Sequence, residues 1–169
     1  MKYKFVMPAR FIVGTVGQPG ERAFFIQVRS ANQLLSVALE KAQVQAVIAR
    51  LEIMIAELRK TQPLIPVEKF PNDDSPLESP VDPEFTVGAI SLAFDDQNQL
   101  ISLALYELED DEVDSEGEVV EIEITLGMAS AFVARSKAVV NAGRLPCPFC
   151  GIPIDPRGHL CPRANGYRR

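Results

Sequence analysis

The hydrophobic positions of this chain change their spacing twice, and in the same order each time. In the first part, apolar residues dominate 11–17 and then alternate with polar residues over 24–29 and 35–40, which is typical of three β-strands. From Gln43 the apolar spacing lengthens to three and four residues, which predicts an amphipathic helix. Its buried side is expected to consist of Val44, Val47, Ile48, Leu51, Ile55 and Leu58.

The same series recurs further along the chain. Residues 85–94 and 100–108 are mostly apolar, and residues 120–126 alternate apolar side chains with Glu and Thr, so three more strands are predicted. A second helix follows. Its apolar side is expected to consist of Met128, Phe132, Val139 and Val140.

Short sequence matches link the two series and preserve their order. The matched pairs are 11–14 with 85–88, 34–39 with 119–124, and 46–50 with 131–135. Three ordered matches indicate a duplicated unit. We therefore predict an α+β fold in which two βββα repeats form one antiparallel sheet with both helices on one face, followed by a C-terminal zinc knuckle.

Four segments follow from this pattern: repeats at 1–60 and 85–143, a connector at 61–84 and a tail at 144–169. The connector holds six of the chain's 13 prolines, a density that prevents both helix and central strand. We interpret it as an extended linker across the surface that lets the halves pack together. The alternative is a proline-rich docking segment for a partner.

Charge is distributed unevenly between these segments. The formal net charge is −6, yet residues 144–169 contain five arginines and one aspartate, a sum of +4 that leaves −10 for the remainder. A body this acidic is a poor general nucleic-acid binder, so nucleic acid could be contacted only through the tail.

The tail also holds every cysteine and the only histidine: Cys147, Cys150, His159 and Cys161. The first two are separated by two residues and the last two by one, and three thiols with one imidazole form the donor set of a closed structural zinc site. One structural Zn²⁺ is therefore predicted as the cofactor. The alternative is a tail of reduced cysteines without metal.

The start of the chain lacks the features of a signal peptide, and no apolar run approaches the about 18 residues of a membrane span. A cytoplasmic location without membrane contact is expected, where paired cysteines more often bind metal than form disulfides.

Beyond the zinc donors lie five residues suited to partner binding: Arg163, Asn165, Tyr167, Arg168 and Arg169. Guanidinium groups bind phosphate and carboxylate, and a tyrosine ring can stack on a base. Alternatively, these residues could dock on the chain's own acidic body.

Catalytic signatures such as a P-loop or a nucleophile elbow are not found in the sequence. The first hypothesis is therefore a non-enzymatic adaptor that docks, through its tail or sheet, onto a protein partner yet to be identified. The second is a nucleic-acid-associated factor that uses the basic tail. The third is an enzyme or enzyme subunit whose ligand lies in a cleft between the repeats.

The tail sequences 143–151 and 158–169, together with 11–17 and 35–41, resemble the DUF3090 family over nearly the whole chain. The resemblance implies a bacterial cytosolic protein with a zinc-finger-like tail. It implies no particular activity, substrate or partner.

Overall fold

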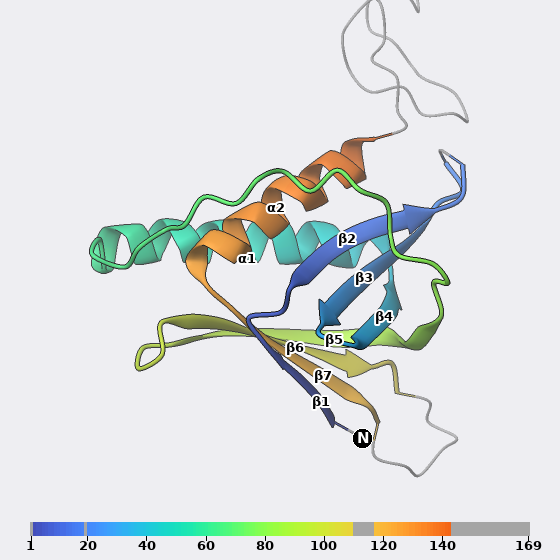
Figure 1. Ribbon diagram of the computed structural model, residues 1–169, viewed down its shortest axis with the longest axis horizontal. Helices are drawn as coiled ribbons and strands as arrows, with labels where there is room; N and C mark the ends of the chain where they lie inside the picture. Colours follow the sequence, from blue (N-terminus) through green and yellow to red (C-terminus); the bar gives the residue numbers. More distant parts are fainter. Residues whose placement is uncertain (1, 19, 110–116, 143–169) are drawn as a thin grey trace, which may run out of the picture.

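Seven strands and two helices form the part of the chain that the structure, a computed structural model, describes: residues 2–18, 20–109 and 117–142 (Figure 1). The strands are β1 (Lys2–Val6), β2 (Arg10–Val16), β3 (Ala23–Ser30), β4 (Gln33–Leu39), β5 (Pro83–Asp95), β6 (Leu100–Glu107) and β7 (Val119–Ile124). The helices are α1 (Lys41–Thr61) and α2 (Leu126–Asn141). The predicted α+β class is confirmed, and both helices lie on the same side of the sheet (Figure 1).

The strands form one sheet in the order β1-β7-β6-β5-β4-β3-β2. The prediction of an antiparallel sheet is wrong for two strand pairs, since β4 with β5 and β1 with β7 are parallel. The first parallel pair arises because α1 and the connector return the chain to the same end of the sheet before β5 begins. The second involves β1, a five-residue strand that was not predicted.

The sheet is strongly curled, and the chain connectivity explains why. Its two edge strands, β1 and β2, are joined by only three residues, 7–9. The four Cα steps from Val6 to Arg10 span at most about 15 Å, whereas the edges of a flat seven-stranded sheet lie about 29 Å apart. The two edges must therefore approach each other at this corner, where Met7 adopts a left-handed backbone with φ of 45°.

Each helix is fixed at its N-terminus by a local hydrogen bond. The Gln43 side chain accepts from the Glu40 backbone N–H at 2.7 Å, and Thr125 Oγ1 accepts from Met128 N–H at 3.2 Å. All six apolar positions predicted for the buried side of α1 are buried. On α2, Phe132 and Val140 are buried while Met128 and Val139 are partly buried against the core.

The connector passes from one face of the sheet to the other around edge strand β2. It first runs along α2 (Figure 1). There the Glu68 backbone lies directly against Gly127. Further along, the Leu77 side chain lies over Gly14 of β2, and Glu78 contacts Gln27, whose side chain points away from the helices. The connector therefore covers an edge that would otherwise leave backbone groups open to pairing with another strand.

Candidate functional site at the seam of the two halves

All nine residues that the sequence singles out lie outside the described residues: Cys147, Cys150, His159, Cys161, Arg163, Asn165, Tyr167, Arg168 and Arg169. Within the described ranges, no three His, Cys, Asp or Glu side chains gather as a metal ion would require. In the same ranges, neither helix combines the length and apolar character needed to cross a membrane. The structure instead draws attention to the place where the connector, β2 and α2 meet.

Arg10, on the edge strand β2, binds the connector through four hydrogen bonds. Its guanidinium donates two hydrogen bonds to the Asp73 carboxylate, one from Nε at 2.7 Å and one from Nη2 at 3.0 Å. The same Nη2 reaches the carbonyl oxygens of Ser75 at 2.9 Å and Pro76 at 3.0 Å. This planar, bidentate geometry is the strongest form of arginine–carboxylate contact.

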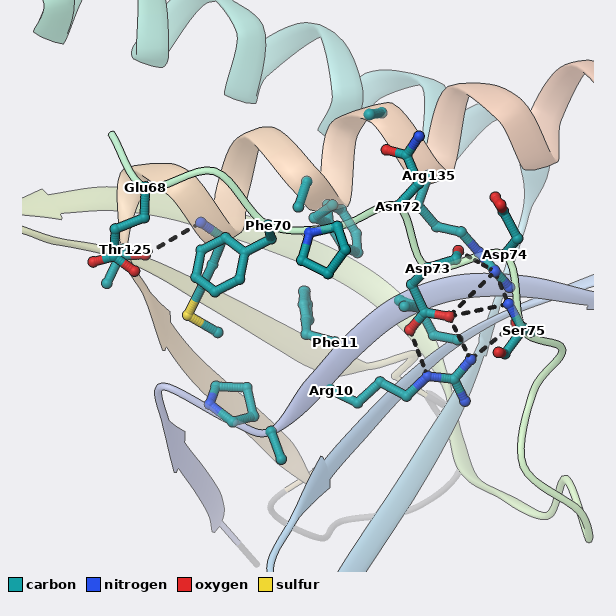
Figure 2. A pocket seen from close by; sticks show the side chains of 18 of the residues that line it. Arg10, Phe11, Glu68, Phe70, Asn72, Asp73, Asp74, Ser75, Thr125 and Arg135 are labelled. Carbon is teal, nitrogen blue, oxygen red and sulfur yellow. Dashed lines mark hydrogen bonds and ion pairs between the residues drawn. The ribbon is translucent and has the colours of Figure 1, made fainter. Parts of the chain in front are cut away.

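Arg135, on α2, binds the same stretch of connector from the other side. Its guanidinium donates to the carbonyl oxygens of Asp73 at 2.6 Å and Ser75 at 2.7 Å, and to that of Val13 in β2 at 3.1 Å. Burial lowers the pKa of Arg135 below its ordinary value, and the nearby Asp73 opposes this effect. Arg10, Arg135, Asp73 and Ser75, here called the arginine clamp, therefore join both halves of the chain through the connector (Figure 2).

The hydrogen bond from Arg10 holds the pKa of Asp73 below its ordinary value of 3.8, so this carboxylate is ionised at neutral pH. A depressed folded-state pKa adds stability above the unfolded pKa, and that stability is lost as pH falls through the folded value. We therefore expect Asp73→Asn to lower the melting temperature at pH 7 and to cost progressively less as the pH drops below about 4. Melting curves of both proteins across pH 2.5 to pH 7, values chosen to bracket the Asp range, would check this. A penalty that does not change with pH would contradict it.

Gln27 anchors the connector on the opposite face of the sheet. Only 2% of this residue is exposed, and its amide forms a paired contact with the Glu78 backbone, accepting from N–H at 2.8 Å and donating to C=O at 3.0 Å. The amide nitrogen also donates to Ser36 Oγ at 3.1 Å. Glu78 in turn forms an ion pair with Arg29. The Gln27 side chain thus pairs with the connector backbone in the way that the backbone of a neighbouring strand would.

Replacing Gln27 by leucine is expected to lower the free energy of unfolding by about 2 kcal/mol, because it leaves the Glu78 N–H and C=O without their partner in a covered site. Urea unfolding measures this change. Arg29→Gln is the matched control, since it removes only a half-exposed ion pair to the same Glu78 and should cost less than about 1 kcal/mol. Equal losses in the two variants would contradict the assigned role of Gln27.

A cavity of about 900 Å³ lies beside the clamp and is here called the seam cavity. It is bounded by residues 7–12, by connector residues 68 and 70–75, and by one side of α2 from its N-cap Thr125 to Ala138 (Figure 2). The rings of Phe11 and Phe132 stack in its wall at a centroid distance of 4.2 Å, with 21° between their planes. This volume falls within the range of small-ligand and peptide-side-chain sites.

The lining combines paired charges, exposed acidic side chains and an apolar wall. Asp73 is paired with two arginines, and the remaining acidic side chains of the lining, Glu68 and Asp74, are exposed. The lining also includes apolar side chains, among them Met128 and Phe70, and Figure 2 shows Phe70 between Glu68 and Asp74. A thiol or imidazole nucleophile cannot come from this lining, because the chain's three cysteines and one histidine all lie within 147–161.

Sequence reasoning missed the clamp because its members come from distant parts of the chain. Arg10 and Asp73 are 63 residues apart, and Arg135 is 62 residues beyond Asp73. No local period connects them. The sequence does offer a signal for the opposite face, where Gln27 is a polar residue within the otherwise apolar series 24–28 of β3 and its buried amide binds the connector.

Comparison with known proteins adds one match. The family described as a protein of unknown function, DUF3090, matches residues 3–161. No curated protein and no solved structure matches the chain. The matched range includes the described fold from Tyr3 onward, the clamp and the four tail residues with metal-donor side chains, and it ends at Cys161.

Proposed function

We propose that this chain, which belongs to the DUF3090 family, is a non-enzymatic zinc-binding adaptor. In this proposal the described body is the scaffold, and the C-terminal segment is the part that meets a partner protein. The single observation that carries the proposal is the concentration of all four soft or borderline donors of the chain at zinc-site spacing within 147–161.

Cys147, Cys150, His159 and Cys161 would fill all four positions of a tetrahedral Zn²⁺, which favours a structural role over a catalytic one. The family match supports this proposal because it reaches Cys161 and so spans every donor. A segment of this length is too short to build a core of its own, so the metal would supply the folding energy.

Cys150→Ser is expected to abolish stoichiometric zinc binding, because a hydroxyl is a poor substitute for a thiolate ligand. The zinc content of purified protein after dialysis against a mild chelator measures the effect. Arg144→Gln is the control, since it changes the same segment without removing a donor. The circular dichroism of the body should be unchanged in both variants. Full zinc retention in Cys150→Ser would contradict the donor set.

We further propose that the body arose by duplication of a βββα unit. The element order supports this, because β2-β3-β4-α1 is followed by β5-β6-β7-α2. The sequence matches support it as well. Residues 11–14 and 85–88 fall in the first strand of each half, 34–39 and 119–124 around the third, and 46–50 and 131–135 in the helix.

The adaptor role is tested by crosslinking the full chain in cells, with and without residues 144–169. An adaptor that works through its tail should yield a discrete protein partner whose recovery depends on that segment, and the identified partner should then bind the purified chain. Recovery of the same partners by the truncated chain would contradict a role for the tail. If the segment instead contacts nucleic acid, the purified protein should shift RNA or DNA at low salt and lose that binding steeply as salt rises.

A further inference from the structure

We propose that the seam cavity is the docking site of the chain's own C-terminal segment, residues 143–169. The inference rests on the proposed function only in that the docked segment is the one assigned to zinc. Its starting point is a cavity whose mouth is apolar, whose free charges are negative and whose wall leads directly to the start of this segment.

Large apolar side chains are exposed at the mouth of the cavity. Met7 is 55% exposed and Phe70 is 43% exposed, and both line the hollow. A neighbouring cavity of about 450 Å³ shares Met7 and Glu68 with it and adds Val6, which is 46% exposed. Large apolar side chains gathered around a concave surface are typical of a binding site.

The free charges at this mouth are negative. Arg10 and Arg135 line the cavity, but their guanidinium groups are engaged by Asp73 and by backbone carbonyls of the connector and β2. Glu68 and Asp74, one on each side of Phe70 in the connector, form no side-chain hydrogen bond or ion pair with any described residue. An occupant that matches this surface therefore combines apolar side chains with positive charge.

The C-terminal segment has that composition. It sums to +4 through five arginines and one aspartate, and it includes the apolar residues Phe149, Ile152, Ile154, Leu160 and Tyr167. It is also tethered beside the cavity. Ala138 lines the cavity, and the last described residue, Ala142, lies only about 6 Å further along the direction of α2.

Tethering favours this segment over other occupants. A short covalent link gives an effective concentration in about the millimolar range, so a modest intrinsic affinity suffices. A second copy of the chain or a basic peptide from a partner has no such advantage and must also overcome the loss of translational freedom. Docking would shield both the cavity and the arginines of the segment, so an external partner of the adaptor would have to displace it.

The test uses the full chain with a site-specific protease recognition sequence inserted between Gly143 and Arg144, and with its four methionines labelled at the ¹³C-methyl group. Met7 and Met128 line the cavity, whereas Met54 packs on α1 away from this lining and serves as the internal control. Cutting converts docking into a bimolecular equilibrium. We expect the Met7 and Met128 signals to shift when the cut protein is diluted and to return when the released segment is added back, with Met54 unchanged.

Charge variants test whether the acidic side chains of the cavity contribute to binding of the segment. Glu68→Gln with Asp74→Asn should weaken binding of the released segment about tenfold at low salt, because two attractive charges are removed. The matched control is Glu57→Gln with Asp82→Asn, which neutralises two exposed carboxylates outside the cavity lining. Equal affinity in the two double variants would overturn the charge argument and with it the proposal.

Unchanged Met7 and Met128 signals after cutting and add-back would overturn the proposal. Signals that instead depend on the concentration of the uncut chain would assign the cavity to a second copy, which also overturns it. Zinc is measured on the same uncut protein. If the methionine signals show no docking while zinc is retained, only the docking proposal is contradicted. If the protein contains no zinc, the proposed metal site is contradicted, and the methionine signals still decide whether the segment docks.

Discussion

Arg135→Ala is expected to lower the free energy of unfolding by about 3 kcal/mol, which corresponds to roughly 10 °C in melting temperature for a chain of this size. The guanidinium donates three hydrogen bonds that tie α2 to both the connector and β2, and its side chain is only 11% exposed. Hydrogen bonds from a charged donor contribute about 1.5–3 kcal/mol each, and water replaces part of that where the site is open. Urea unfolding followed by circular dichroism measures the loss.

Arg50→Ala provides the control for this prediction. Arg50 occupies the matching position in the first half of the sequence, on α1, where its side chain is exposed. A surface substitution of this kind should stay within about 0.5 kcal/mol. Arg135→Lys should recover only part of the loss, since an ammonium keeps the charge but not the planar fork. If Arg135→Ala proves as mild as Arg50→Ala, the clamp does not hold the halves together.

Gly127→Ala is expected to destabilise the protein by about 3 kcal/mol, although alanine normally stabilises a helix relative to glycine. The reason is steric. A Cβ at Gly127 would lie 2.4 Å from the Glu68 carbonyl oxygen and 2.8 Å from its nitrogen, so the connector backbone would have to move off α2. Thermal melting monitored at the helix signal measures the change.

Gly14→Ala tests the same idea where the obstacle is softer. A Cβ there would meet the Leu77 side chain at 2.4 Å, but a leucine can change rotamer whereas a backbone cannot. The loss should therefore be clearly smaller than that of Gly127→Ala. A stabilising effect at Gly127, as in an ordinary helix, would show that the connector does not lie against α2 as described.

The periodic elements could be predicted because each carries its own signal. All six buried positions of α1 follow from three- and four-residue spacing, and the alternation predicted over 24–29 lies in β3, where Phe24, Ile26 and Val28 are buried in the core. The strand β1 was missed, although a signal for it existed. Lys2 and Lys4 alternate as Glu121 and Glu123 do on β7, and they pair with them at 3.0 and 3.5 Å.

The candidate site could not be predicted in the same way. Gln27 is one of the polar residues that alternate with apolar ones over 24–29, and it is buried because the connector returns over it from 51 residues away. Arg10, Asp73 and Arg135 come from an edge strand, a proline-rich segment and a helix, so only the three-dimensional path of the connector brings them together. Nothing in a proline-rich composition specifies which surface it will cover.

Zinc binding by the C-terminal donors is tested most directly by elemental analysis of freshly purified, reduced protein, in the full chain and in a chain lacking residues 144–169. We predict one zinc per full-length chain and none in the shortened one, with the body folded in both. A full chain without metal, or a shortened chain that keeps it, would contradict the assignment of Cys147, Cys150, His159 and Cys161 as ligands.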